Sequence, residues 1–248
     1  MKKPNTMGGT SARGPEPGRI RNPSASGPRK KVLLVDEQPM MRRALTELLN
    51  EEKDLRVCGG VGNAPDAMKE IKARKPDLVL ADLALPGKHG LELIKEVRAQ
   101  FPQVFILIIS AHDETLYASR SLRAGANGYV MKSESGETIL KAVRRVLAGA
   151  GYVSDNMSAK ILDIFSGRTF SHSPIDPLTD REFEVFELIG QGKGSLQIAR
   201  QLCLSPKTVD AHRGNIKKKL KLAGGSELVR TAVRWVESEH LDPHDSPR

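Results

Sequence analysis

The sequence predicts an α/β domain built on a doubly wound, five-stranded parallel sheet, joined to a small all-α domain of four helices. Two observations predict this division. Between residues 31 and 148, short apolar runs alternate five times with segments of helical periodicity. From residue 178 onward, only helical periodicity is present. A chain of 248 residues is also longer than most single domains, so two domains are expected.

The predicted strands are apolar throughout and do not alternate between apolar and polar residues. Such runs are typical of strands buried on both faces, as in a parallel sheet with helices on either side. One common order for a doubly wound sheet is 2-1-3-4-5, and we expect it here. The five runs are KVLLV (31–35), LRVCG (55–59), DLVLA (77–81), VFILII (104–109) and NGYVM (127–131).

Most of the formal net charge of +9 is concentrated near the N-terminus. Residues 1–30 hold seven Lys or Arg and one Glu, and they are rich in Gly, Pro and Ser without apolar periodicity. A segment of this composition cannot bury a core, so we expect a disordered basic tail. A solvated leader is the expected role, and a non-specific DNA-contacting arm is the alternative.

Composition argues against a membrane or secreted protein. The apolar run 104–109 is far too short to span a bilayer, and the basic N-terminus has no apolar segment of the kind found in secretion signals. The two cysteines, Cys58 and Cys203, fall in different predicted domains, so a disulfide is not expected. We therefore expect a cytoplasmic protein without a membrane partner.

Polar side chains follow four of the five predicted strands. Asp36 and Glu37 follow the first strand, Asp82 the third, Ser110 the fourth and Lys132 the fifth. A single acid after a strand is more often a helix cap than a functional group. The carboxyl ends of parallel strands, however, meet at one edge of the sheet, where ligands bind in such folds. Together these five residues indicate a site.

The chemistry that suits this set of groups is phosphoryl transfer to a carboxylate. Three neighbouring carboxylates repel one another and need a cation, and Mg²⁺ prefers oxygen ligands. A carboxylate can act as the nucleophile and form an aspartyl phosphate. Mg²⁺ and Lys132 would then neutralise the phosphoryl oxygens, while Ser110 binds one of them. Asp82 is the best acceptor because it follows the central strand.

Residues 31–148 resemble a two-component receiver domain. The segments VLLVDEQP, PDLVLADLALPGKHGLELI, ILIISAH and AGANGYVMKS occur in the order and at the spacing of that family. The resemblance implies that Asp82 is the phosphoacceptor and that Ser110 and Lys132 bind the phosphoryl group. It further implies a Mg²⁺ site made by the side chains of Asp36, Glu37 and Asp82 and the backbone carbonyl of Ala84.

The resemblance also assigns Tyr129 as the aromatic that rotates inward on activation. An ordinary strand aromatic with its hydroxyl at the surface is the alternative. Two positions depart from the family pattern. Glu37 stands where Asp is common; the charge is kept, so we expect Mg²⁺ binding to survive. Ala84 offers no polar side chain two residues after the acceptor, at a position that influences the lifetime of the acyl phosphate in the family.

A connector follows the receiver-like segment. Residues 154–165 show helical periodicity behind Ser154, which is a plausible N-cap, and residues 166–177 are rich in Gly, Ser and Pro. We expect a linker over 149–177 that contains one short helix.

The last segment has strong helix-start signals. Thr179 with Glu182 three residues later forms a capping box, and Ser205 before Pro206 marks another helix start. A helix, a tight break and a second helix make a helix-turn-helix. Residues 191–221 hold eight Lys or Arg residues and a single acidic residue, Asp210. This charge pattern is expected for a segment that contacts DNA phosphates.

Residues from LTDREFEVF to KKKLKL resemble the LuxR-type DNA-binding domain. We expect that domain over 178–238, followed by a C-terminal tail at 239–248. The resemblance implies that some residues of this segment contact the DNA backbone and that others face the DNA groove. The groove-facing residues are Asp210, Ala211 and Gly214. The full predicted DNA-binding set is Lys207, Thr208, Asp210, Ala211, His212, Arg213, Gly214, Lys217 and Lys218.

With both halves, the chain resembles a response regulator of the NarL/FixJ type. The resemblance implies a transcription regulator that a sensor histidine kinase phosphorylates, that binds double-stranded DNA and that forms a homodimer when phosphorylated. One alternative is a DNA-binding regulator that needs no phosphate and uses the receiver as a dimerisation platform. The other is a phosphohydrolase, but Ala84 stands where an aspartate-based phosphatase needs a second acid. We therefore do not expect an enzyme.

Overall fold

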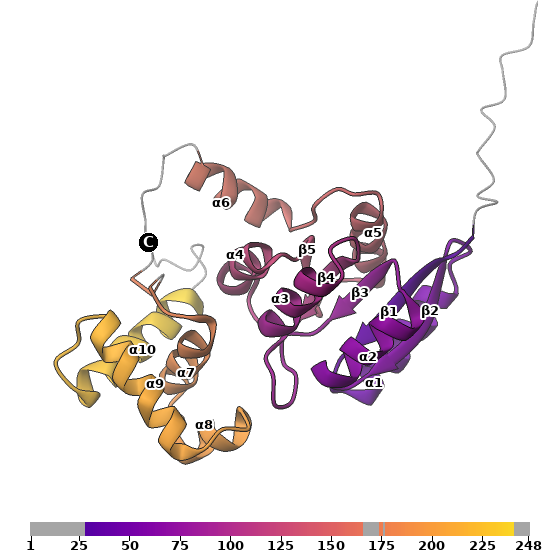
Figure 1. The fold of residues 1–248 in the computed structure, drawn as a ribbon. Helices are drawn as coiled ribbons and strands as arrows, with labels where there is room; N and C mark the ends of the chain where they lie inside the picture. Colours follow the sequence, from indigo (N-terminus) through magenta and orange to yellow (C-terminus); the bar gives the residue numbers. More distant parts are fainter. Residues whose placement is uncertain (1–27, 166–173, 176, 241–248) are drawn as a thin grey trace, which may run out of the picture.

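The computed structural model describes residues 28–165, 174–175 and 177–240 (Figure 1). Nearly all of the predicted basic tail (1–30) and most of the predicted C-terminal tail (239–248) lie outside the described residues. The same holds for most of the Gly/Ser/Pro-rich stretch at 166–177. Two bodies are visible in Figure 1, a sheet with helices around it and a group of helices beside it.

The first body is the predicted five-stranded parallel sheet. Its strand order is β2-β1-β3-β4-β5, and every neighbouring pair is parallel, so the predicted order is confirmed. Strand ends differ from the prediction by one or two residues. The longest extension is in β2, which pairs with β1 as far as Val61. The strands are β1 (Lys30–Val35), β2 (Leu55–Val61), β3 (Leu78–Ala81), β4 (Phe105–Ser110) and β5 (Gly128–Met131).

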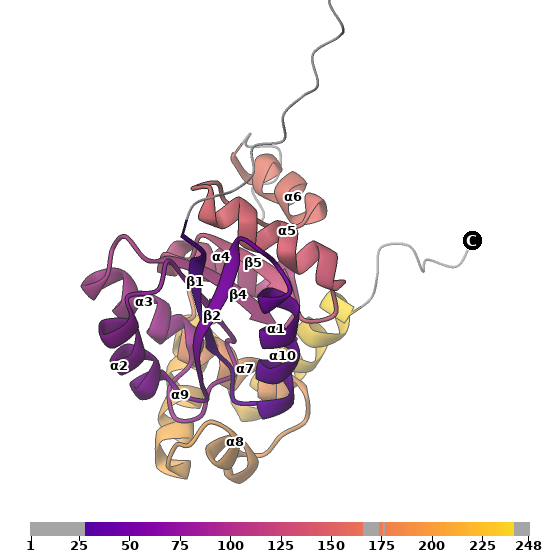
Figure 2. The same cartoon turned by 90° about the vertical axis from the view of Figure 1, so that its right-hand side faces the viewer.

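Helices cover both faces of the sheet (Figure 2). One apolar cluster joins the sheet to α2, α3 and α4, and a second joins it to α1 and α5. This double burial explains why the strands are apolar throughout. The helices are α1 (Pro39–Asn50), α2 (Ala64–Arg74), α3 (Gly90–Gln100), α4 (Glu114–Ala124) and α5 (Gly136–Leu147).

Helix α3 begins directly against the end of β3. A Cβ atom on Gly90 would lie 2.6 Å from the Asp82 carbonyl oxygen and 2.6 Å from the Leu83 Cα. Both are backbone atoms that cannot move aside cheaply, so only glycine fits. The close approach fixes where the loop after Asp82 must return to the sheet.

The predicted connector helix is present as α6 (Asp155–Phe165). The Ser154 hydroxyl accepts a hydrogen bond from the Met157 amide at 3.1 Å, which is the expected N-cap. The Ser154 amide in turn donates to Glu114 at the start of α4, at 2.8 Å. Met157 is buried, so α6 packs against the first body next to α4.

The second body consists of the four predicted helices. The capping box at the start of α7 is formed as expected: the Thr179 amide donates to Glu182 at 2.8 Å, and the Glu182 amide donates to the Thr179 hydroxyl. Ser205 caps α9. The bounds are α7 (Asp180–Gly190), α8 (Ser195–Gln201), α9 (Pro206–Lys219) and α10 (Gly225–His240).

Glu182 ties the start of α7 to the end of α9, because its Oε2 also accepts from Nζ of Lys219 at 2.6 Å. Burial acts to raise the pKa of Glu182, but the hydrogen bonds from Lys219 and Thr179 outweigh it and the pKa is lowered. A carboxyl with a lowered pKa in the folded state stabilises the fold above its ordinary pKa of 4.5. That stability is lost as the pH falls through the lower, folded-state value.

Glu182→Gln should therefore cost about 1–2 kcal/mol at pH 7, and the difference from wild type should shrink below pH 4.5. The measurement is thermal unfolding from pH 7 to pH 3. Glu47→Gln is the control; it weakens the exposed pair with Arg43 and should cost less than about 0.5 kcal/mol. A Glu182→Gln difference that does not change with pH would contradict this account.

Candidate functional site

Two buried carboxylates meet at the carboxyl edge of the sheet. Asp36 follows β1 and Asp82 follows β3, which are neighbours, and the two residues are 1% and 2% exposed. The Lys132 Nζ, reaching over from the end of β5, lies 2.6 Å from Asp36 Oδ2 and 2.7 Å from Asp82 Oδ2. Three of the predicted site residues are therefore in direct contact. With both acids ionised, one ammonium group balances only one of the two negative charges.

Backbone amides hold the other oxygen of each carboxylate. The Asp36 Oδ1 accepts from the Gln38 amide at 2.8 Å, and the Asp82 Oδ1 accepts from the Leu83 amide at 2.7 Å. Each acid thus has one oxygen fixed by the following turn and one that faces Lys132. Burial acts to lower the pKa of Lys132, but its hydrogen bonds to Asp36 and Asp82 outweigh this, so its pKa is raised and it stays charged.

Ser110 and Tyr129 lie beside this cluster. Ser110 is the last residue of β4, is fully buried, and accepts a hydrogen bond from the His112 amide at 3.2 Å. The Tyr129 ring is also fully buried, and its hydroxyl donates to the His112 carbonyl at 2.7 Å. The alternative of a surface hydroxyl on Tyr129 is therefore wrong. Burial raises the pKa of Tyr129, so the phenol keeps its proton.

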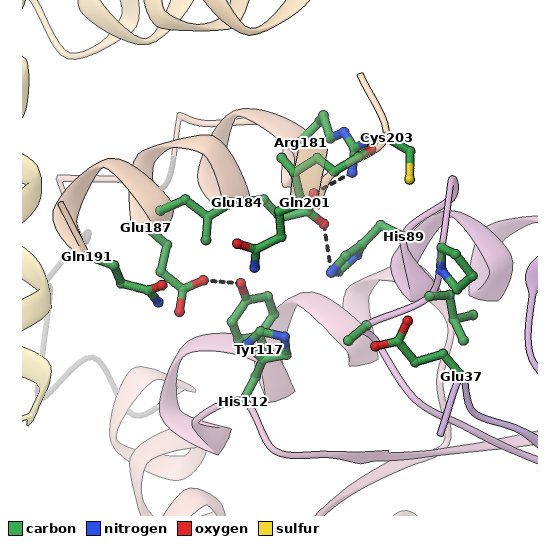
Figure 3. Close-up of a pocket in the computed structure, with 15 residues that line it drawn as sticks. Glu37, His89, His112, Tyr117, Arg181, Glu184, Glu187, Gln191, Gln201 and Cys203 are labelled. Carbon is green, nitrogen blue, oxygen red and sulfur yellow. Dashed lines mark hydrogen bonds and ion pairs between the residues drawn. The ribbon is translucent and has the colours of Figure 1, made fainter. Parts of the chain in front are cut away.

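Glu37 and Ala84 occupy a different position. Both are exposed, and both line a cavity of about 300 Å³ between the two bodies (Figure 3). Within the part of the chain that the structure describes, no three His, Cys, Asp or Glu side chains are grouped as in a metal centre. Of the three predicted carboxylates, Asp36 and Asp82 are thus brought together, while Glu37 lies on the outer wall.

The far wall of this cavity is α7, a contact that sequence reasoning missed. The His89 Nε2 lies 2.6 Å from Glu184 Oε1, and the Tyr117 hydroxyl donates to Glu187 (Figure 3). Arg120 donates to the Leu178 carbonyl at 3.1 Å. No local sequence signal marks the contact: the glutamates of α7 stand between its apolar positions, and it is the structure that shows every residue from 182 to 189 to be buried.

The predicted DNA-binding residues all lie on α9, and none of them is buried. Val209 and Ile216 of the same helix are fully buried, whereas Leu220, directly after it, is only partly buried against the same apolar cluster. Asp210 is already engaged, because its Oδ1 accepts from the Ser195 hydroxyl at 2.9 Å. The exposed members are Lys207, Asp210, Ala211 and Lys218, and the half-buried members are Thr208, His212, Arg213, Gly214 and Lys217.

None of the helices that the structure describes has the length and apolar character needed to cross a membrane.

Two family models match the chain. The response regulator receiver domain matches residues 32–144, and the luxR family of bacterial regulatory proteins matches residues 176–232. The first match contains the Asp36–Lys132–Asp82 cluster, and the second contains α7, α8 and α9.

Curated relatives match over nearly their whole length. Transcriptional activator protein ExaE of Pseudomonas putida is 34% identical over 203 residues, which is 82% of this chain and 95% of the relative. Response regulator GacA of Pseudomonas aeruginosa is 34% identical over 205 residues, with coverage of 82% and 95%. Oxygen regulatory protein NreC of Staphylococcus haemolyticus is 32% identical over 210 residues, with coverage of 82% and 97%.

Solved structures agree on the fold. Salmonella enterica RcsB, bound to promoter rprA with the phosphomimetic BeF₃⁻, has a TM-score of 0.59 at 20% identity, covering 83% of this chain and 99% of that one. A LuxR-family response regulator from Aurantimonas has a TM-score of 0.53 at 28% identity, covering 56% and 99%. The chain belongs to the NarL/FixJ-type response regulators of two-component systems, which are DNA-binding transcription regulators with a receiver domain and a LuxR-type helix-turn-helix domain.

Proposed function

We propose that Asp82 accepts a phosphoryl group from a sensor histidine kinase and that this modification controls DNA binding or dimerisation. The observation that carries the proposal is the buried cluster in which Lys132 bridges Asp36 and Asp82. A carboxylate held beside a charged ammonium group suits nucleophilic attack on phosphorus followed by capture of the product.

In the transfer step, an oxygen of Asp82 forms a bond to phosphorus while the bond from phosphorus to the donor nitrogen breaks. Lys132 binds one phosphoryl oxygen through its ammonium group, and Ser110 binds another through its hydroxyl. Burial keeps water away from the acyl phosphate. The Tyr129 hydroxyl donates to the His112 carbonyl, and the His112 amide donates to the Ser110 hydroxyl. When the Ser110 hydroxyl turns toward the phosphoryl group, Tyr129 moves with it.

The site also fits Mg²⁺, since two carboxylates share one ammonium and leave a negative charge uncompensated. Asp36 and Asp82 would hold the ion, with Glu37 and the Ala84 carbonyl at the mouth of the site completing the set. When bound, Mg²⁺ supplies positive charge that offsets the charge of the phosphoryl oxygens.

For DNA, we propose that α9 enters the major groove of double-stranded DNA. The basic residues Lys207, Arg213, Lys217 and Lys218 suit contacts to the phosphate backbone. Asp210 and its neighbours Ala211 and Gly214 suit the positions nearest the bases. A phosphorylated homodimer would place two such helices on paired half-sites. Since the regulator acts on DNA, we propose a cytoplasmic location.

The same proposal keeps the domain limits predicted from the sequence. The matched ranges 32–144 and 176–232 support a receiver over 31–148 and a DNA-binding domain over 178–238. Residues 149–177 are then the linker, and residues 1–30 and 239–248 are tails.

The test is selection from a random double-stranded DNA library by the full chain, with Mg²⁺ and with or without BeF₃⁻. We expect BeF₃⁻ to enrich paired half-sites, because the phosphoryl analogue favours the dimer. Asp82→Ala should lose this enrichment. Selection of the same sites at equal strength without BeF₃⁻, and by Asp82→Ala, would instead favour the regulator that needs no phosphate.

A further inference from the structure

The one acidic residue of the basic segment 191–221 is held in place by a neighbouring helix. Asp210 lies in the second turn of α9, and its Oδ1 accepts a hydrogen bond from the Ser195 hydroxyl at 2.9 Å. Ser195 is the first residue of α8, which packs against α9 (Figure 1). The bond therefore joins the two helices of the helix-turn-helix through their side chains.

The Ser195 hydroxyl is not needed to begin α8. The N-cap of this helix is Gly194, whose amide donates to the Gln197 side chain at 3.0 Å. A serine that caps a helix stands one position earlier, where its oxygen accepts from the first amides, as Ser205 does for α9. The Ser195 hydroxyl instead donates to a residue fifteen positions later on another helix. Its role in this structure is therefore to hold the Asp210 carboxylate.

The second oxygen of Asp210 is open to a ligand from outside the chain. Among the residues that the structure describes, Asp210 makes no other hydrogen bond and no ion pair, although Lys207 and Arg213 stand three residues before and after it. The residue is also exposed. Because DNA phosphates repel a carboxylate, binding is favoured only where Oδ2 meets a hydrogen-bond donor of the duplex.

The surface around Asp210 lets its short side chain reach the bases. Ala211 is exposed, and Gly214 lies one turn after Asp210 on the same face of α9. A Cβ atom built on Gly214 would have no heavy atom within 4 Å, so no neighbouring side chain covers the helix backbone there. With alanine and glycine as neighbours, Asp210 can approach the base edges as closely as the helix itself allows.

The four bases offer different groups to a carboxylate in the major groove. Guanine presents only acceptors, and thymine presents an acceptor and a methyl group, so neither can donate to a carboxylate. Adenine places the acceptor N7 beside its N6 amino group, whereas cytosine presents its N4 amino donor alone. A carboxylate oxygen therefore accepts best from cytosine, and adenine comes second.

We infer that Ser195 and Asp210 act as a pair that selects cytosine in the major groove. In this inference, which rests on the proposed entry of α9 into the groove, Oδ2 of Asp210 accepts from the N4 amino group of the base. Ser195 is a positioning residue. By holding Oδ1 it keeps the carboxylate in one orientation, so less rotational freedom is lost when the base binds. The pair thus sets one base of each half-site.

The test uses the full chain with Mg²⁺ and BeF₃⁻. Sites that wild type enriches from random double-stranded DNA are made again with each of the four base pairs at every position, and the Kd is measured for each. We expect one position per half-site where cytosine binds about tenfold more tightly than guanine or thymine. Asp210→Ala should lose the preference there and keep it elsewhere. Asp210→Asn should move it to adenine, because an amide donates to N7 and accepts from N6.

Two substitutions of Ser195 test the positioning role. Ser195→Ala removes the hydroxyl and leaves Asp210, so the preference for cytosine should persist but shrink by about fivefold. Ser195→Thr keeps a hydroxyl and should restore the preference. Glu237→Gln is the matched control for a lost negative charge. Glu237 is exposed on α10, so its substitution should change the Kd equally for all four bases.

Other results would decide against the inference. If Asp210→Ala leaves the preference unchanged at every position, Asp210 reads no base, and the proposed DNA binding stands. If both Asp210 variants tighten binding equally to all sequences, Asp210 only repels the duplex. If Ser195→Ala keeps the full preference for cytosine, Ser195 does not position the carboxylate. If wild type selects no sequence with or without BeF₃⁻, the proposed entry of α9 into the groove fails, and the inference fails with it.

Discussion

Asp82→Asn is expected to abolish phosphorylation completely. When wild type is incubated with Mg²⁺ and acetyl phosphate, its intact mass should rise by one phosphate, while the variant should show no gain. The amide of Asn lacks the anionic oxygen that attacks phosphorus. The substitution keeps the side-chain volume, and Lys132 retains Asp36 at 2.6 Å, so the receiver should remain folded.

Asp77→Asn is the matched control for this experiment. Asp77 precedes β3 at the opposite end from Asp82, and it accepts from the Lys31 amide at 2.8 Å and pairs with Lys30. An asparagine can still accept the amide hydrogen bond, so Asp77→Asn should gain phosphate as wild type does. A phosphate gain that persists in Asp82→Asn would place the acceptor elsewhere.

Phe183→Ala is expected to destabilise the DNA-binding domain by about 3–5 kcal/mol, the usual cost of removing a buried aromatic ring. The Phe183 ring is fully buried and lies edge-on to Tyr117 at 5.2 Å and to Trp235 at 5.4 Å. The Arg120 guanidinium sits 4.2 Å from its centroid. Truncation would leave a cavity lined by both domains. It would also remove the aromatic contacts of this ring and its cation–π contact with Arg120.

Urea denaturation followed by Trp235 fluorescence measures this loss, because the only tryptophan of the chain lies on α10 beside α7. Leu196→Ala serves as the control. Leu196 is 64% exposed on α8, so its truncation should change stability by no more than about 0.5 kcal/mol. If the two variants lose similar stability, Phe183 does not hold the domains in the way described.

The receiver fold and much of its site could be predicted because their signals are local. Each strand is a single apolar run, and the polar residue that ends it falls at the carboxyl edge once the strands are parallel. This logic placed Asp82 and Lys132 together, and the structure has them 2.7 Å apart. The helix starts at Thr179 and Ser205 were equally local, since a cap and its amide lie three residues apart.

The domain interface could not be predicted, because its signal is not local. An amphipathic pattern assumes one buried face, yet α7 is buried by its own domain on one side and by the receiver on the other. That pattern gives no indication of the partners of Glu184 and Glu187, which are 4% and 8% exposed in the structure. Glu37 shows another limit: it follows Asp36 directly in the sequence, yet it is exposed and lines the cavity between the domains, so its part in Mg²⁺ binding stays a prediction.

The pairing of Lys219 with Glu182 has a consequence for how ionic strength acts on DNA affinity. Each lysine that neutralises a DNA phosphate releases counterions and steepens the dependence of affinity on salt. A lysine already paired with a carboxylate brings little net charge to the duplex. DNA affinity should therefore depend less steeply on salt concentration than the number of Lys and Arg residues near α9 suggests. As Glu182 takes up a proton in acid, Lys219 is released, and DNA affinity should become more sensitive to salt.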